Sequence, residues 1–185
     1  MHVTLSWDLI VVVFFAIVLA YSFIVGKNES VKIIIASYIA IVAVAAIGNL
    51  LDMGLGGSQS MMQMLGFSLD KNTLSTVKLI LFVAVIIFLA IRGGFEMEYA
   101  KDIDGVWEIV LTAGFGIATA GLLLTALLTY IGAEPLLDPN LGSAPLLQPL
   151  LEESQLVGYM VQYQAVWFAL PAVLLLIVGF VNGEK

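Results

Sequence analysis

The sequence predicts an all-α fold: a polytopic membrane bundle of about five transmembrane helices with short interfacial helices in two loops. Three observations predict it. Hydrophobic residues make up 61% of the chain and charged residues only 11%, against roughly 25% charged residues in soluble domains. The mean hydropathy is +1.07. Two long apolar runs are joined only by Gly26-Lys27-Asn28-Glu29-Ser30, which predicts a transmembrane hairpin because each run reaches the roughly 20 residues that a membrane-spanning helix needs.

The hydrophobic pattern indicates one integral membrane domain, residues 1–185, with helices at about 7–26, 31–51, 73–91, 107–131 and 160–181. Trp7 suits the membrane interface and Asp8 suits the positive end of the first helix. We expect this helix to be retained, because its apolar part is longer than that of a cleaved signal peptide and no basic segment precedes it. Asn28 is the expected N-cap of the second helix. Pro171 is expected to kink the last helix.

The two longer connections differ in composition from the helices. Residues 52–72 combine glycines and serines with the methionine-rich segment Met61–Phe67, which predicts a short amphipathic helix lying at the interface. A methionine cluster can also bind Cu(I), but without cysteine or a nearby histidine we favour adaptable packing. Residues 132–156 contain four prolines and the apolar pairs Leu146-Leu147 and Leu150-Leu151, which indicates a connection along the membrane surface.

Small residues recur at close spacing in the second and fourth predicted helices. Such residues let helix backbones approach closely in a membrane, so we interpret them as helix-packing positions or as contacts with a partner. They are Ala36, Ala40, Gly48, Gly114, Gly116, Ala118, Ala120 and Gly121.

Three polar side chains in or near the predicted spans form a candidate polar pathway: Lys78, Gln162 and Gln164. An ionisable group within a membrane span is a functional hypothesis by default. The alternative is structural, because Lys78 lies near the start of its helix, where its side chain can reach the headgroups. The two glutamines then sit at the interface.

Enzyme chemistry has little support in the residues. The chain has one histidine and no cysteine, which excludes thiol catalysis and histidine clusters inside the membrane. The acidic residues Glu96, Glu98, Asp102 and Asp104 could hold a hard divalent cation, but their spacing fits a solvated connection better. We therefore expect no catalytic residue, metal or cofactor. The net charge of −7 comes from carboxylates scattered through loops and indicates no nucleic-acid partner.

Basic residues predict the orientation. With five spans, Lys27, Lys32, Arg92, Lys101 and Lys185 fall on one side. Because basic residues favour the cytoplasmic side, the N-terminus is expected outside and the C-terminus in the cytoplasm.

A family resemblance rests on several segments together. They are Trp7-Asp8-Leu9-Ile10, the first helix ending at Gly26-Lys27, the alanine-rich second helix, and the glycine-rich fourth helix followed by Leu141-Gly142-Ser143-Ala144-Pro145-Leu146. Over residues 7–155 the chain resembles the colicin V production protein family of bacterial inner-membrane proteins. The resemblance implies a multi-pass inner-membrane protein associated with toxin export or envelope maintenance, from a family with no agreed catalytic residues to carry over.

Two functions follow from these observations. The first is a non-catalytic scaffold or assembly subunit of a bacterial envelope or export complex, embedded in the lipid bilayer and bound to a membrane-protein partner or to itself. The alternative is a small oligomeric transporter or channel. Few buried charges are available for an ion to use, so the sequence favours the scaffold.

Overall fold

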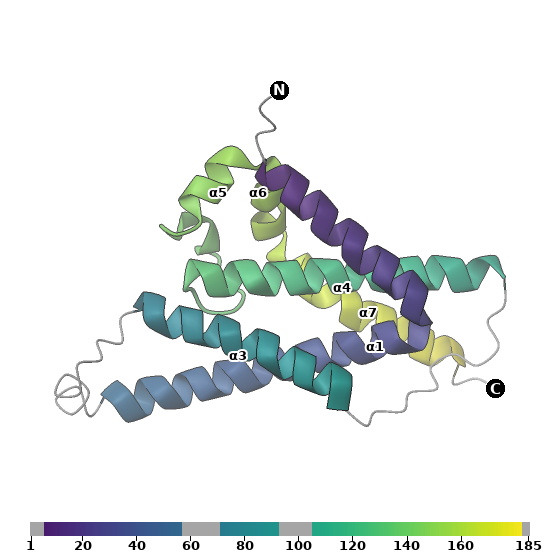
Figure 1. The fold of residues 1–185 in the computed structure, drawn as a ribbon, viewed down its shortest axis with the longest axis horizontal. Coiled ribbons are helices and arrows are strands. Elements are labelled where there is room, and N and C mark those ends of the chain that lie inside the picture. Colours follow the sequence, from purple (N-terminus) through teal and green to yellow (C-terminus); the bar gives the residue numbers. More distant parts are fainter. Residues whose placement is uncertain (1–5, 57–70, 93–104, 183–185) are drawn as a thin grey trace.

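The computed structural model describes residues 6–56, 71–92 and 105–182, and every regular element in these ranges is helical. The predicted all-α fold is therefore confirmed. The methionine-rich segment Met61–Phe67 and the acidic residues 96–104 lie outside the described residues. The elements are α1 (Trp7–Gly56), α3 (Lys71–Arg92), α4 (Val106–Gly132), the 3₁₀ helix η1 (Leu141–Ser143), α5 (Gln148–Glu153), α6 (Gln155–Gln162) and α7 (Gln164–Asn182) (Figure 1).

Helix α1 bends sharply at Gly26. This residue has φ 82° and ψ 177°, while the residues on both sides are helical, so the chain folds back into two arms without a loop (Figure 1). We call residues 7–25 the first arm and residues 27–56 the second arm. The expected start of the second helix at residue 31, with Asn28 as its N-cap, is wrong, because helical geometry resumes directly after Gly26. Glycine can adopt this backbone conformation because it has no Cβ atom, whereas a residue with a side chain would be strained there.

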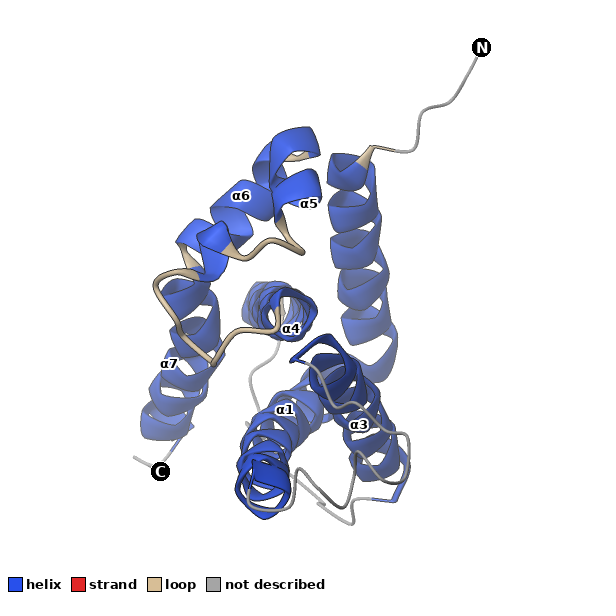
Figure 2. Ribbon diagram, turned by 90° about the vertical axis from the view of Figure 1, so that its left-hand side faces the viewer, coloured by secondary structure: helices blue, strands red, loops and turns tan. Residues whose placement is uncertain are grey.

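Helix α4 lies at the centre of the bundle, with the two arms of α1, α3, α6 and α7 arranged around it (Figure 2). One hydrophobic cluster joins the start of α1 to the end of α4, η1 and α6. A second joins the second arm, α3 and the later half of α4. A third joins the second arm, the early half of α4 and the later part of α7. Every cluster includes residues of α4, which explains why this helix is the most deeply buried.

The last predicted helix consists of two pieces. Helices α6 and α7 meet at Tyr163 with a bend of 66°, so the predicted range 160–181 joins the end of α6 to α7. We expected a kink at Pro171, but this bend lies earlier in the chain. Helix α7 continues through Pro171.

Long apolar helices dominate the described parts of the chain. By length and composition, three could cross a membrane, within Trp7–Leu50, Ser75–Arg92 and Val106–Gly132. The bent pair α6 and α7 would make a fourth if it counts as one span. This count treats bent α1 as one helix. Large hydrophobic side chains stay exposed on α1, α3, α4 and α7, as expected of surfaces that face lipid.

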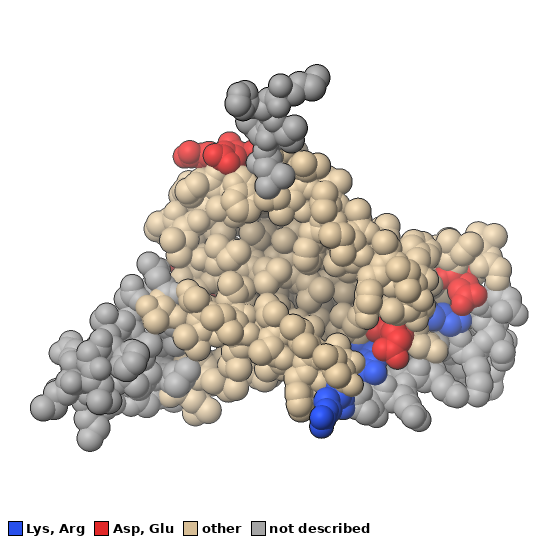
Figure 3. All heavy atoms as spheres, in the orientation of Figure 1, with Lys and Arg blue, Asp and Glu red and all other residues tan. Residues whose placement is uncertain are grey.

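Charged side chains gather near one end of the bundle. Figure 3 shows Lys and Arg, with acidic neighbours, near the bend of α1, the end of α3 and the start of α4. Basic residues at these places are Lys27, Lys32 and Arg92. Around α5, at the opposite end, the charged side chains visible in the same view are acidic.

Candidate functional site

The candidate site is the set of contacts that α4 makes through its small residues. A Cβ atom built at Gly116 would lie 2.8 Å from Cδ1 of Leu19 and 3.1 Å from the side chain of Ser22. Contacts under 3.0 Å are too short for a real Cβ, so a larger residue at Gly116 would have to displace the end of the Leu19 side chain, as expected where a small residue lets two helices approach closely. Gly116 is therefore a contact between helices of the same chain.

Gly121 receives an aromatic ring in the same way. A Cβ atom built there would overlap the indole of Trp167 from α7. The same indole packs edge-on against Phe15 of α1, with 5.8 Å between ring centroids and 68° between ring planes. Trp167 of α7 thus contacts both α1 and α4.

The other predicted packing positions divide into two groups. Ala36, Ala40, Ala118 and Ala120 are fully buried within the chain, and Gly48 lies under the side chain of Lys78. Gly114 differs, because a Cβ built there would meet nothing within 4 Å. Seven of the eight predicted positions are thus used inside the described bundle, which leaves them little surface for a partner.

The residues of the candidate polar pathway lie at different places. Lys78 of α3 is half-buried against Gly48 of the second arm. Gln162 is exposed at the end of α6, whereas Gln164 is buried at the start of α7 and donates its amide to the carbonyl of Asp138 at 2.6 Å. The structure therefore places Lys78 against the second arm of α1 and Gln164 against the connection that follows α4.

Asp8 makes a contact that the sequence interpretation missed. It was expected to stabilise its own helix, but its Oδ1 accepts hydrogen bonds from the hydroxyl of Ser154 and from the amide of Leu156 at 3.1 Å. Ser154 is also the N-cap of α6 and accepts from the amide of Val157 at 3.0 Å. Carboxylate and hydroxyl together satisfy amides that a helix start leaves without partners. The only signal in the sequence was Ser154 itself, a capping residue directly before an apolar segment.

Tyr38 joins the second arm to α7. Its hydroxyl donates to the carbonyl of Phe168 at 2.5 Å. This bond joins two segments that lie 130 positions apart in the sequence.

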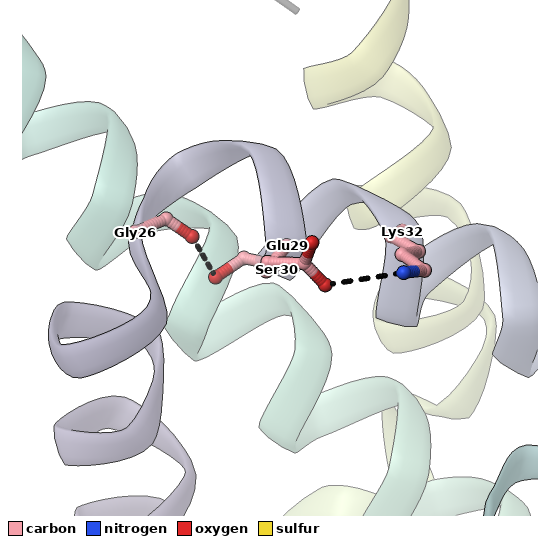
Figure 4. Close-up of polar contacts among 4 residues, drawn as sticks. All are labelled: Gly26, Glu29, Ser30 and Lys32. Carbon is pink, nitrogen blue, oxygen red and sulfur yellow. Dashed lines mark hydrogen bonds and ion pairs between the residues drawn. The ribbon is translucent and has the colours of Figure 1, made fainter. Parts of the chain in front are cut away.

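The bend of α1 has polar contacts of its own (Figure 4). The hydroxyl of Ser30 donates to the carbonyl of Gly26 at 3.0 Å. Lys32 pairs with Glu29 at 3.5 Å between Nζ and Oε2. Such a surface pair contributes little stability, so the conformation of Gly26 and the packing of the arms hold the bend.

These contacts join helices of the bundle to one another. Among the described residues no group of three or more His, Asp or Glu side chains is placed to hold a metal ion. Comparison of the chain with protein-family models, with curated proteins and with solved structures finds no match.

Removing the Asp8 carboxylate tests the contact between α1 and α6. We expect Asp8→Ala to speed hydrogen exchange at the amides of Leu156 and Val157, because the start of α6 loses an acceptor. Hydrogen-exchange mass spectrometry of the full chain in detergent measures this. Glu153→Ala, one residue before the cap, is the control and should change these amides little. Unchanged exchange in Asp8→Ala would contradict the assigned contact.

Proposed function

We propose that this chain is a non-catalytic integral membrane scaffold, an assembly subunit of a bacterial envelope or export complex. One observation carries the proposal: polar side chains inside the bundle, such as Tyr38 and Ser75, join helices to one another. Ser75 of α3 donates to the backbone carbonyl of Tyr130 in α4. Side chains used in this way give a bundle that keeps its shape and offers its outer apolar surface to lipid and to other membrane helices.

The proposed membrane arrangement has five spans. The bend at Gly26 divides α1 into two arms, each near or above the roughly 20 residues that cross a bilayer. With α3, α4 and the bent pair α6 and α7, this makes five. Lys27, Lys32 and Arg92 then lie at the cytoplasmic end by the positive-inside rule, with the N-terminus outside and the C-terminus inside.

The location and the kind of complex come from the family resemblance. Similarity to the colicin V production protein family supports a place in the bacterial inner membrane and a role in export or envelope maintenance. Side chains of α1 and α7 pack against Gly116 and Gly121 of α4, so these two glycines are not available to a partner. We therefore assign partner contact to exposed faces, such as the outer face of the first arm, which includes Ile17 and Ile24.

The alternative is a small oligomeric transporter or channel. The observation that favours it is Gln164, a polar side chain that is only 8% exposed and whose Oε1 has no hydrogen-bond partner among the described residues. Its separation from Lys78 argues against a single continuous pathway inside one copy of the chain.

Crosslinking in cells separates the two functions. The chain has no native cysteine, so single cysteines report on chosen faces. We expect Ile17→Cys or Ile117→Cys, both at exposed positions, to crosslink to a different membrane protein after a bifunctional maleimide is added. Ala40→Cys and Ala120→Cys, at fully buried positions, are the controls and should give no band. Bands only to a second copy would support the oligomeric transporter, and no bands from any exposed face would contradict the scaffold.

A further inference from the structure

Two buried polar atoms, one on α4 and one on α7, have no hydrogen-bond partner among the described residues: Oγ1 of Thr125 and Oε1 of Gln164. Thr125 is 0% exposed and Gln164 is 8% exposed. A buried polar atom without a partner destabilises a fold. Each such atom in a native structure therefore calls for a physical explanation, often a bound water molecule.

The orientation of the Gln164 amide is fixed by its neighbour. Its Nε2 donates to the carbonyl of Asp138 at 2.6 Å. Exchanging the amide oxygen and nitrogen would place two acceptors against each other, so Oε1 must point away from Asp138. This oxygen accepts hydrogen bonds and cannot donate them.

Thr125 differs from the threonines on either side of it in α4. The hydroxyl of Thr119 donates to the carbonyl of Phe115 at 2.7 Å, and that of Thr129 donates to the carbonyl of Thr125 at 2.9 Å. Such bonds back to the preceding turn are usual for threonine in apolar helices. The Thr125 hydroxyl makes no such bond, which leaves it available for a contact across the interface.

The register of the two helices brings these atoms to the same level. Helices α4 and α7 run antiparallel, because Val178 packs in the cluster of Phe115 while Trp167 covers Gly121. Thr125 follows Gly121 by one turn, and Gln164 precedes Trp167 by about one turn. Both positions therefore lie next to the break at Tyr163, between α6 and α7.

We propose that Thr125 and Gln164 bind a water molecule between α4 and α7, beside the break at Tyr163. The amide oxygen requires a ligand that donates a hydrogen bond, which excludes an anion. The hydroxyl can donate or accept, and water serves both atoms while being small enough for a buried interface. Where a helix is interrupted within a membrane, the backbone groups that lose their helical partners also need polar side chains or ordered water nearby. This inference does not rest on the scaffold function.

Thr125→Val tests the proposal, because valine has almost the same shape without the hydroxyl. In the full chain in detergent micelles we expect a melting temperature lower by about 2–4 °C, the shift for a lost hydrogen bond in a chain of this size. Gln164→Leu should lower it further, since the bond to Asp138 is lost as well. The double variant should lose less than the sum, because both residues serve one water. Thr119→Val is the matched control.

Radiolytic labelling identifies the ligand. A water bound at this level should yield hydroxyl radicals on X-ray exposure that oxidise the nearby Trp167, and Thr125→Val should reduce that oxidation several-fold. A melting temperature unchanged or raised by Thr125→Val would overturn the proposal, because removing an unsatisfied hydroxyl is neutral or stabilising. Coupled melting temperatures without water-dependent labelling would also overturn it, since they indicate a direct bond between the two side chains.

Discussion

Gly121→Ala is expected to destabilise the bundle by about 1–3 kcal/mol, the usual cost of overpacking a well-filled interior. The added methyl group would overlap the indole of Trp167. That ring cannot move away easily, because Phe15 packs against it from the first arm of α1. Thermal or denaturant unfolding of the purified chain in detergent, followed by circular dichroism, measures the loss.

The matched control is Gly114→Ala in the same helix. A Cβ at Gly114 would meet nothing within 4 Å, so alanine brings only its better helix propensity. That gain is up to about 1 kcal/mol. Opposite signs for the two substitutions are the expected result. Equal effects at Gly114 and Gly121 would contradict the contact between Gly121 and Trp167.

Gly26→Ala is expected to open the angle between the two arms of α1. Gly26 has φ 82° and ψ 177°, a region open essentially to glycine alone, where another residue costs about 1–3 kcal/mol. No atom lies within 4 Å of a Cβ built there, so the penalty comes from the backbone. Alanine relieves it by adopting helical geometry, which straightens α1 and pulls the first arm away from α4.

Spin labels on the two arms measure this opening. Ile17 and Val42 are exposed on the first and second arm, and pulsed electron spin resonance gives the distance between labels placed there. We expect a longer or broader distance distribution in Gly26→Ala. Gly105→Ala is the control, because Gly105 also has positive φ, at 81°, but lies outside α1. An unchanged distance in Gly26→Ala would show that packing alone holds the bend.

The helical content and the approximate positions of the apolar helices could be predicted from composition and run length, because both depend on local sequence. The bend at Gly26 could not be predicted in detail. Lys27, Asn28, Glu29 and Ser30 are compatible with either a turn or a helix, and only packing of both arms against α4 selects the one-residue bend. The break at Tyr163 was missed because Pro171 was the stronger local signal for a bend.

The candidate site shows a second limit. Sequence spacing identified Gly116 and Gly121 as places where another helix approaches, but it carries no information on which helix that is. The same limit applies to Asp8, whose partner Ser154 lies 146 positions away, and to Tyr38, whose partner Phe168 lies 130 positions away. One polar side chain within an apolar run does not specify a distant backbone group, so these contacts require the structure.

The contact between Asp8 and the start of α6 also sets an order of events during synthesis. The carboxylate enters the membrane interface early, but Ser154 is made 146 residues later. At about 5–20 residues per second, that interval is roughly 7–30 s. Trp167 is made 46 residues after Gly121, which takes about 2–9 s at the same rate, and during that time the Gly121 face of α4 is not yet covered by α7. The newborn chain therefore passes through a stage in which a chaperone or a sister subunit can occupy the place later taken by its own last helix.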